Sequence, residues 1–320
     1  MKKIVFICPF FGKLPENQIS IWLKTCERNP KIEWIILTDD KKKYSYPKNV
    51  KVIYTTLKEL KNTIQKKFDF KISLESAYKL CDFKPTYGYV FQDLIKEYDY
   101  WGHCDLSDSI FGDIEKNLSN ILDQDYDKIG FLGHLTLYKN NEEVNKRFFL
   151  SSETKKPLNE ILGIKENMGF DETYNYSINF IYKYNHFDFK RIDDLYVDIS
   201  TRSSSFRNVC WSNELKWDHL SKEKYIIEWQ NGKLYKVFLQ DGEIKKEELL
   251  YVHYQKRKMN YKIDMKNINH FFIVPNEFIY IKNLNPSIIK KYTKEKLINK
   301  TLFYIRINKL KKKINNFMKG

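Results

Sequence analysis

Carboxylates follow a hydrophobic segment near the centre of the first half of the sequence. Residues 98–104 are apolar and aromatic, as in a buried strand, and Asp105, Asp108 and Asp113 come soon after them. Open α/β sheets bind ligands at the carboxyl ends of their strands. Two acids three positions apart can share one Mn²⁺ or Mg²⁺ ion through hard oxygen ligands. The segment predicts a metal site, with the alternative that Asp108 only caps the helix predicted after it, a role that also suits Asp113.

A histidine and two cations end a second predicted strand, at 249–254. A neutral imidazole at His253 can complete the shell of a metal ion, and Lys256 and Arg257 can hold diphosphate oxygens. The alternative is a strand-end histidine beside a solvated basic run. We expect Asp105, Asp108 and His253 to bind one ion.

Charged residues in the first third of the chain can line the same cleft. Asp39 follows a predicted strand and can meet the base or ribose of a nucleotide, or can simply form a turn. Lys79, Asp82 and Lys84 lie around a predicted helix and can face the nucleotide, or can be surface charges. We predict these four residues as parts of the nucleotide site.

An acidic pair in the middle of the chain is a candidate for catalysis. Asp171 and Glu172 follow Gly169 in a segment without clear periodicity. A carboxylate within hydrogen-bond reach of an acceptor hydroxyl can activate or orient it. Acidic pairs in loops are often only solvated, and this alternative stays open.

Strands and helices alternate through the first 133 residues. Strands are predicted at 3–8, 33–37, 50–55, 98–104 and 128–133, and helices at 18–29, 57–68, 77–83, 92–97 and 114–122. This alternation predicts an α/β fold with a mostly parallel central sheet flanked by helices. Further along, the Asn231-Gly232 dipeptide between two alternating segments predicts a hairpin over 225–239.

The composition limits the class of protein. A chain of 320 residues with 42% hydrophobic residues can form a sizeable core, and its net charge of +15 favours an anionic partner. Five cysteines without CxxC spacing argue against a zinc site and a disulfide framework. The apolar N-terminal run is short and ends at Pro9, and no segment reaches the ~20 apolar residues of a membrane span. We expect a cytoplasmic protein.

The last forty residues carry most of the excess of positive over negative charge. Residues 281–320 contain 12 Lys or Arg and a single acid, Glu295. Apolar residues recur there at helical spacing: Phe303, Ile307, Leu310, Ile314 and Phe317. This basic amphipathic tail can lie on an anionic membrane, where each cation contributes about 1 kcal/mol, or can pack its apolar stripe on the domain. We expect peripheral contact with the inner face of the plasma membrane.

Short motifs in the chain resemble a family of bacterial glycosyltransferases with the GT-A fold. That family belongs to gene clusters for capsule, lipopolysaccharide and other surface polysaccharides. The matching segments are Cys8–Pro15, Thr38–Asp40, Tyr78–Pro85, Trp101–Asp105, Ile110–Asp113, Gly133–Tyr138 and His253–Arg257. The resemblance covers about residues 1–260, and its most specific part is Trp-Gly-x-Cys-Asp followed by Phe-Gly-Asp.

The resemblance implies roles for particular residues. The metal-binding acids of the family fall on Asp105 and Asp108, and its C-terminal metal-binding histidine falls on His253. Asp39 lies beside its nucleotide-facing loop, which falls on Pro9, Phe10, Phe11 and Gly12. The usual acid–x–acid signature is replaced by Asp-Leu-Ser-Asp, so either Ser107 or Asp108 is the second ligand.

Residues and resemblance together predict a metal-dependent hexosyltransferase. It would move a hexose from a UDP-sugar to a hydroxyl of a cell-surface glycan or a lipid-linked oligosaccharide. We predict a GT-A-like domain at 1–280, with a donor half at 1–139 and an acceptor half at 140–280, and a tail at 281–320. One alternative is a nucleic-acid-binding protein, although the cations concentrate in the tail and no aromatic–basic RNA motif is present. The other is an inactive relative that only binds nucleotide-sugar.

Overall fold

The computed structural model describes residues 2–317, and the side chains of residues 2–308 and 310. The chain divides into two compact units, which are described separately. The first contains Met1–Ser107 and Ile114–Asp193, and the second contains Asp108–Asp113 and Asp194–Gly320. The predicted domain boundaries stay predictions. Within residues 2–317, no helix combines the length and the apolar character needed to cross a bilayer.

A seven-stranded sheet forms the centre of the first unit, in the order β3-β2-β1-β4-β7-β6-β8. Its strands are β1 (Ile4–Phe10), β2 (Ile32–Thr38), β3 (Val50–Tyr54), β4 (Tyr100–Cys104), β6 (Lys128–Leu132), β7 (Leu135–Lys139) and β8 (Phe189–Lys190). β3, β2, β1 and β4 are parallel, whereas β7 runs antiparallel to both β4 and β6. The predicted α/β class with a mostly parallel sheet flanked by helices is confirmed, although the sheet is mixed. β7 is not predicted from the sequence; only Gly133 and His134 join it to β6, and so short a link requires an antiparallel pair.

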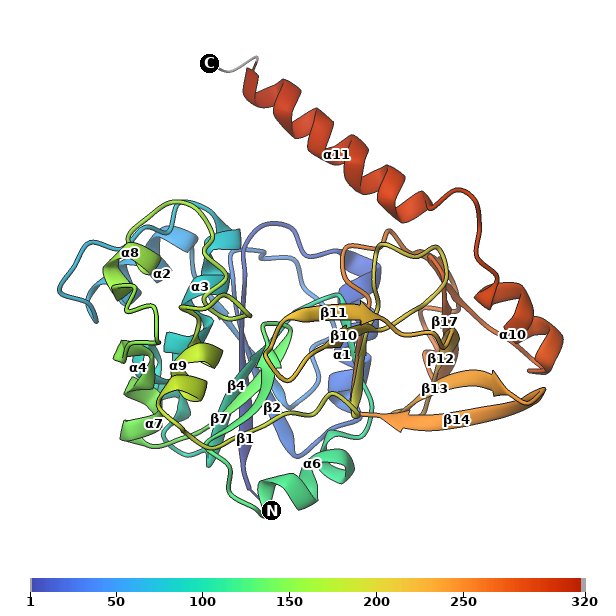
Figure 1. Ribbon diagram of the computed structural model, residues 1–320, viewed down its shortest axis with the longest axis horizontal. Helices are drawn as coiled ribbons and strands as arrows, with labels where there is room; N and C mark the ends of the chain where they lie inside the picture. Colours follow the sequence, from blue (N-terminus) through green and yellow to red (C-terminus); the bar gives the residue numbers. More distant parts are fainter. Residues whose placement is uncertain (1, 318–320) are drawn as a thin grey trace. The chain divides into compact units, whose positions relative to one another are not determined.

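Helices cover both faces of this sheet (Figure 1). The side chains of β1 alternate between the two faces of the sheet. On one face, Val5 and Ile7 enter a core shared with helices α2, α3 and α9. On the other face, Phe6 stacks on Trp34, and Trp34 contacts Trp22 of helix α1 edge-on. The helices are α1 (Glu16–Glu27), α2 (Leu57–Gln65), α3 (Leu80–Phe83), α4 (Tyr87–Val90), α5 (Gln92–Ile95), α6 (Ile114–Leu122), α7 (Glu142–Lys146), α8 (Leu158–Leu162) and α9 (Ile178–Tyr184). Three 3₁₀ turns add η1 (Ala77–Lys79), η2 (Lys84–Thr86) and η3 (Arg147–Phe149).

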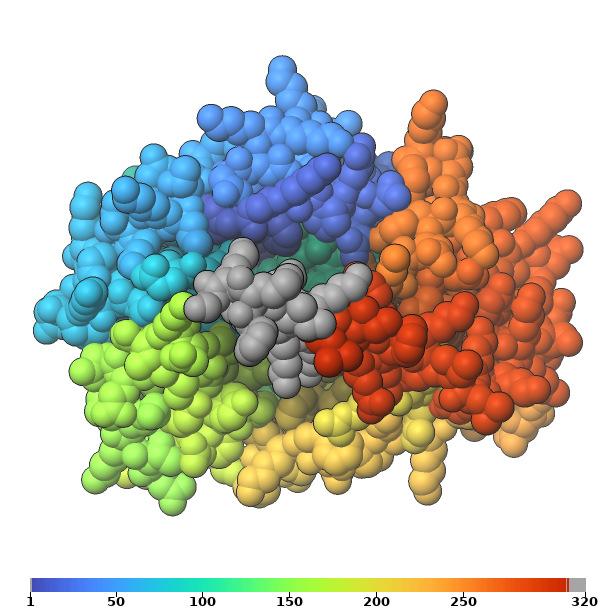
Figure 2. Space-filling view, turned by 90° about the horizontal axis from the view of Figure 1, so that it is seen from above, coloured from blue at the N-terminus to red at the C-terminus, as the bar shows by residue number. Residues whose placement is uncertain are grey.

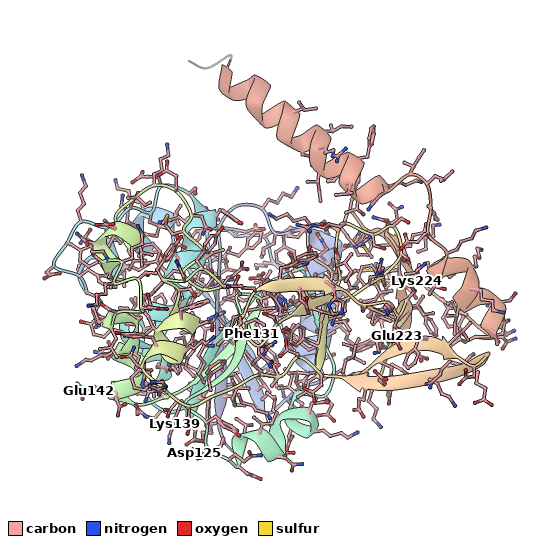
Figure 3. All side chains as sticks on the ribbon, viewed as in Figure 1. Asp125, Phe131, Lys139, Glu142, Glu223 and Lys224 are labelled. Carbon is pink, nitrogen blue, oxygen red and sulfur yellow. The ribbon has the colours of Figure 1, made fainter. Side chains whose placement is uncertain are left out.

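Exposed ion pairs at the edge of this unit add little to its stability. Lys139, at the end of β7, pairs with Asp125, which follows α6, and the two are labelled side by side in Figure 3. Lys2 also lies 3.1 Å from Asp125. Surface pairs of this kind contribute about 0–1 kcal/mol each, so the unit depends on its buried faces.

The second unit is mainly antiparallel. Its six-stranded sheet has the order β14-β13-β12-β17-β18-β16, and a three-stranded sheet has the order β5-β15-β9. The strands are β5 (Ser109–Phe111), β9 (Tyr196–Asp198), β10 (Val209–Trp211), β11 (Trp217–Leu220), β12 (Tyr225–Gln230), β13 (Lys233–Gln240), β14 (Glu243–Leu249), β15 (Tyr251–His253), β16 (Asn260–Lys262), β17 (His270–Val274) and β18 (Glu277–Ile279). The predicted hairpin is confirmed: Gln230 pairs with Lys233, and Asn231 and Gly232 both have positive φ, as a type I′ turn requires.

Two helices end the second unit, α10 (Pro286–Thr293) and α11 (Lys300–Phe317). α10 packs against β12 and β13, and in Figure 2 the red C-terminal residues lie beside the orange residues of this unit. Of the predicted apolar stripe, Phe303 is 64% exposed and Leu310 is 59% exposed, so these two do not pack on the protein. The side chains of Ile314 and Phe317 lie outside the described residues.

Gly112, in the motif Phe-Gly-Asp, allows β5 to approach the chain beside β15. Its N–H donates to the carbonyl of Leu250 at 2.8 Å, and a Cβ at Gly112 would lie 2.3 Å from the carbonyl oxygen of Leu249. Beside it, Trp229 donates its indole N–H to the carbonyl of Phe111 at 2.9 Å.

Gly112→Ala should therefore destabilise the protein by about 1–3 kcal/mol, because the added methyl group has to displace backbone. The melting temperature measured by circular dichroism should fall by about 2–4 °C per kcal/mol. An unchanged melting temperature would show that the close approach of Gly112 to the backbone of Leu249 does not contribute to stability.

Candidate functional site

A buried lysine joins two of the predicted site carboxylates in the first unit. Lys84 Nζ lies 2.7 Å from Asp105 Oδ1 and 3.3 Å from Asp171 Oδ2, and it donates to the carbonyl of Gly133 at 2.8 Å. Lys84 begins η2, Asp105 follows β4, Gly133 follows β6 and Asp171 comes from the loop between α8 and α9. Three predicted site residues thus converge near the carboxyl end of β4.

Burial and charge set the ionisation of this cluster. Burial raises the pKa of Asp171 to about 7, against the opposing effect of Lys84. Burial would lower the pKa of Lys84, but Asp105 and its other neighbours outweigh it and raise that pKa well above the ordinary value. The cluster therefore keeps a cation beside a carboxyl group whose pKa lies near neutral, which suits proton transfer.

A buried ion pair positions the loop that carries Asp171. Lys79 Nζ lies 2.8 Å from Asp82 Oδ2, and the two side chains are 1% and 0% exposed. Lys79 also donates to two carbonyls in residues 161–166, and Asp82 accepts from two N–H groups in residues 168–170. These polar groups face their own unit, and nucleotide binding by Lys79 and Asp82 stays a prediction.

A third buried lysine, Lys128, supports the same loop and was not predicted as a site residue. Lys128 of β6 donates to Gly130 O at 2.7 Å and to Asn179 Oδ1 at 2.6 Å, and Asn179 in turn donates to the carbonyls of Phe131 and Glu172. Burial lowers the pKa of Lys128 to about 7. A charged residue at the start of an otherwise apolar strand was the signal available in the sequence.

Lys128→Met should change how stability depends on pH. Between pH 7 and about 10.4 the unfolded lysine holds a proton that the native lysine lacks, so stability rises with pH in this window. The methionine variant should lose this contribution, which is at most about 1.4 kcal/mol per pH unit. Urea unfolding at pH 7, 8 and 9 measures it.

The matched control for this prediction is Lys146→Met, which removes an exposed lysine paired with Glu142. Its stability should follow the same pH slope as the unaltered protein. Equal slopes for all three proteins would contradict a neutral Lys128 in the native state.

The loops after β1 and β2 are joined by hydrogen bonds. Gly12 N–H donates to Asp39 Oδ1 at 2.7 Å, and Leu14 N–H donates to Asp40 Oδ2 at 2.9 Å. Gly12 has a φ of +96°, which favours glycine. The structure thus places the predicted nucleotide loop, Pro9–Gly12, next to Asp39 at the carboxyl ends of neighbouring parallel strands. That these residues bind a nucleotide stays a prediction.

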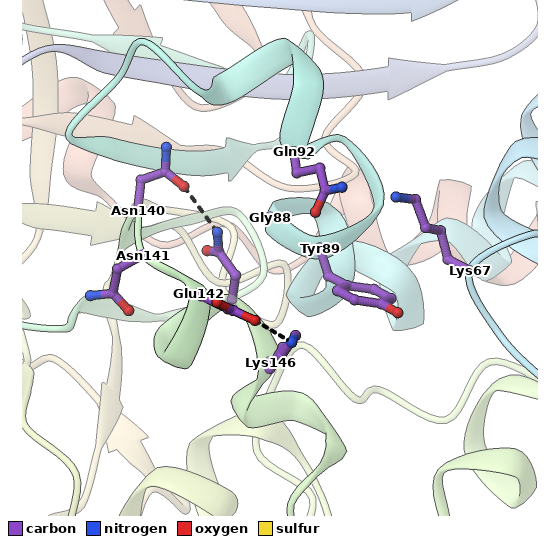
Figure 4. Close-up of a pocket in the computed structure, with 9 residues that line it drawn as sticks. Lys67, Gly88, Tyr89, Gln92, Asn140, Asn141, Glu142 and Lys146 are labelled. Carbon is purple, nitrogen blue, oxygen red and sulfur yellow. Dashed lines mark hydrogen bonds and ion pairs between the residues drawn. The ribbon is translucent and has the colours of Figure 1, made fainter.

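A polar surface pocket of about 420 Å³ lies elsewhere on the first unit (Figure 4). Asn145 donates to Asn140 Oδ1 at 2.9 Å and accepts from the indole of Trp101 at 2.6 Å, and Glu142 pairs with Lys146. The bond from Trp101 connects α7 to β4, so Asn145 serves the fold.

In the second unit, His253 lies between two carboxylates. Its Nδ1 is 2.9 Å from Asp198 Oδ1, and its Nε2 is 3.7 Å from Asp108 Oδ2. β15 pairs with β5 on one side and β9 on the other, which aligns His253 with Ser109 and with Asp198. The structure thus brings together Asp108 and His253, which are far apart in the sequence.

Asp198 is held in place and fixes the orientation of His253. Its N–H donates to Asn208 Oδ1 at 2.7 Å, and its Oδ1 accepts from the side chain of Gln255 at 2.8 Å. A histidine that donates its Nδ1 proton to a carboxylate is oriented to bind a metal ion through Nε2, once Nε2 has released its own proton. Burial would lower the pKa of His253, but hydrogen bonds to Asp108 and Asp198 outweigh it and raise that pKa well above its usual value.

Imidazole nitrogen and carboxylate oxygen are both ligand types that divalent metal ions accept, so the donor set could hold one. Asp198 was not predicted from the sequence. Its signal was an acid inside the apolar segment 195–199.

The predicted diphosphate-binding pair, Lys256 and Arg257, has two different environments. Lys256 is exposed. Arg257 is 2% exposed, and its guanidinium donates to the carbonyls of Ser200 and Ser203 and to the hydroxyl of Thr301. Arg257 thus holds the loop after β9, and diphosphate binding by the two residues stays a prediction.

Fold and sites together define an α/β protein with a carboxylate–lysine cluster in its first unit and a histidine between carboxylates in its second. The chain belongs to DUF6625, a family of unknown function, whose profile matches residues 6–282. A search of curated proteins found no match.

Among solved structures, the chain is similar to three glycosyltransferases. Mouse xyloside xylosyltransferase 1, in its apo form, has 11% identity and a TM-score of 0.39, over 62% of this chain and 89% of that one. GlyE of Streptococcus pneumoniae TIGR4 has 14% identity and a TM-score of 0.33, over 61% and 46%. The galactosyltransferase LgtC, in complex with donor and acceptor sugar analogs, has 10% identity and a TM-score of 0.34, over 62% and 77%. Similarity at this level does not identify an activity.

Proposed function

We propose that the protein is a metal-dependent glycosyltransferase that moves a hexose from a UDP-sugar to a hydroxyl of a cell-surface polysaccharide or its lipid-linked precursor. The observation that carries the proposal is the geometry of His253, whose Nδ1 is held by Asp198 and whose Nε2 faces Asp108. The motif resemblance supports this class of enzyme, and the solved structures named above belong to the same class.

In this proposal Asp108 and His253 bind Mn²⁺ or Mg²⁺. A bound divalent cation would stabilise the negative charge that develops on the leaving diphosphate, and two unit charges about 4 Å apart interact by about 4 kcal/mol at an effective dielectric constant near 20. Asp105 remains the predicted further ligand. It precedes Asp108 by three residues, so the two Cα atoms are at most about 11 Å apart.

The remaining roles follow from charge and placement. Lys84, with Lys256 and Arg257 as predicted partners, would bind the diphosphate, and Pro9–Gly12 with Asp39 would bind the nucleoside. Asp171 or Glu172 would face the acceptor hydroxyl, and a pKa of about 7 at Asp171 suits proton transfer at neutral pH. The exposed Phe303 and Leu310 on the basic tail support contact with the inner face of an anionic membrane.

A thermal-shift screen of nucleotide-sugars, with and without Mn²⁺, tests the proposal. A ligand at 100 times its Kd stabilises the folded state by about 2.7 kcal/mol, so a UDP-sugar should raise the melting temperature clearly, and only when Mn²⁺ is present. Full transfer in EDTA would contradict the metal, and absence of a shift with every nucleotide-sugar would contradict the enzyme class.

A further inference from the structure

Three consecutive serines of the second unit hold one carboxylate. Ser203 and Ser205 donate to Glu295 Oε1 at 2.8 and 2.7 Å, and Ser204 donates to Oε2 at 2.6 Å. The backbone N–H of Ser205 also points to Oε2, at 3.4 Å. Glu295 is the single acid of the basic tail, so the tail places its one anion on this serine loop, residues 203–205.

Buried donors and cations surround the serine loop. Ser203 is 6% and Ser205 0% exposed, whereas the side chain of Glu295 is 40% exposed. The guanidinium of Arg257 donates to Ser203 O at 2.8 Å, and its buried Nε has no hydrogen-bond partner in the described part of the chain. Lys224 Nζ lies 4.0 Å from Glu295 Oε1. The serine loop therefore combines buried donors with nearby positive charge, and the carboxylate that it binds, Glu295, is open to solvent.

The serine loop strongly favours an anion. Burial would raise the pKa of Glu295, but hydrogen bonds from Ser204, Ser205 and Ser203 outweigh it and lower the pKa to about 2. Because Glu295 is partly exposed, solvent screens part of this preference. Each hydroxyl can rotate to donate to a different oxygen, so the donors are not limited to the planar shape of a carboxylate.

We propose that residues 203–205 form an oxyanion site for a phosphate group, and that Glu295 occupies this site from within the chain. A phosphate monoester offers three terminal oxygens, one for each serine hydroxyl, and its greater charge gains more from Lys224 and Arg257 than a carboxylate does. Phosphate and Glu295 exclude one another, so phosphate binding releases the tail from the serine loop. The inference is independent of the proposed transferase activity.

Glu295→Ala tests the site directly, with inorganic phosphate as the probe in isothermal titration calorimetry. Emptying the site should tighten phosphate binding at least about tenfold over the unaltered protein, and adding Ser203→Ala, Ser204→Ala and Ser205→Ala should abolish the gain. Glu243→Ala, which removes an exposed acid paired with Lys245, is the matched control and should leave phosphate binding unchanged. Circular dichroism confirms that each variant is folded.

The unaltered full chain gives a second readout. If phosphate displaces Glu295, it should speed trypsin cleavage at Lys294 and Lys296 several-fold over sodium chloride of equal ionic strength. Cleavage of Glu295→Ala should be fast and should not respond to phosphate.

Binding to lipid vesicles shows whether the phosphate group that binds the serine loop belongs to a lipid headgroup or to a soluble molecule. Flotation of the full chain with phosphatidic acid vesicles, compared with phosphatidylglycerol vesicles, should depend on the three serines if a lipid phosphomonoester is the ligand. If the protein floats equally with both kinds of vesicle but binds inorganic phosphate in calorimetry, then the ligand of the site is a soluble phosphate. If Glu295→Ala binds phosphate no better than the unaltered protein and phosphate does not change cleavage, the serine loop only docks the tail and the proposal is overturned.

Discussion

His253→Ala should weaken Mn²⁺ binding and sugar transfer at least about 100-fold while leaving the fold intact, because loss of an orienting group alone costs about 10–100-fold. The ring is 12% exposed, and its removal leaves Asp108 and Asp198 without the group that lies between them. Asp198→Asn should cost about 10–100-fold in Mn²⁺ affinity, since a neutral amide oxygen accepts the Nδ1 hydrogen bond more weakly than a carboxylate does. Isothermal titration with Mn²⁺ measures both variants.

His270→Ala is the matched control for the metal site. His270 also belongs to the second unit and also faces a carboxylate, with its Nε2 2.9 Å from Glu228 Oε1. This variant should bind Mn²⁺ as the unaltered protein does. If it loses as much affinity as His253→Ala, the effect is general destabilisation and the metal site is not at His253.

Lys79→Met should destabilise the first unit by about 3–5 kcal/mol, because it leaves Asp82 charged in the interior without its cation. Methionine keeps the length and apolar bulk of the side chain, so the loss reports the charge and the two hydrogen bonds to residues 161–166. The loop with Asp171 should loosen at the same time. Urea unfolding measures the stability, and hydrogen exchange of residues 161–172 measures the loop.

Lys146→Met removes a pair of similar geometry at the surface. Lys146 lies 2.5 Å from Glu142, and the two side chains are 50% and 82% exposed. This variant should cost at most about 1 kcal/mol. If Lys79→Met costs no more than Lys146→Met, then burial does not make the Lys79–Asp82 pair important.

Features set by neighbouring residues could be predicted from the sequence. The Asn231-Gly232 hairpin is fixed by two residues that accept positive φ, and the helix at Ile114–Leu122 is fixed by its local apolar spacing. β7 was not predicted, because its place between β4 and β6 and its antiparallel direction depend on pairing with strands elsewhere in the chain. Short strands such as β9 contain too few residues to show a period, so Asp198 was missed with it.

Burial of charged residues could not be predicted. An i,i+3 pair of Lys79 and Asp82 has the same spacing on an exposed helix as in a core. What distinguishes the two cases is the loop at 161–170, which comes about eighty residues later and supplies their backbone partners. Arg257 is similar: its position beside Lys256 predicted diphosphate binding or, as the alternative, a solvated basic run, whereas its guanidinium is buried under the loop after β9.

The six residues Asp108–Asp113 belong to the second unit, although the chain on both sides of them belongs to the first. A fragment that begins at Asp194 would lack β5, so β15 would keep only one of its neighbours and Trp229 would lose the carbonyl of Phe111. We therefore expect a fragment that begins at Asp194 to fold poorly by itself, and on the ribosome the C-terminal unit must use a strand that was synthesised about eighty residues before the rest.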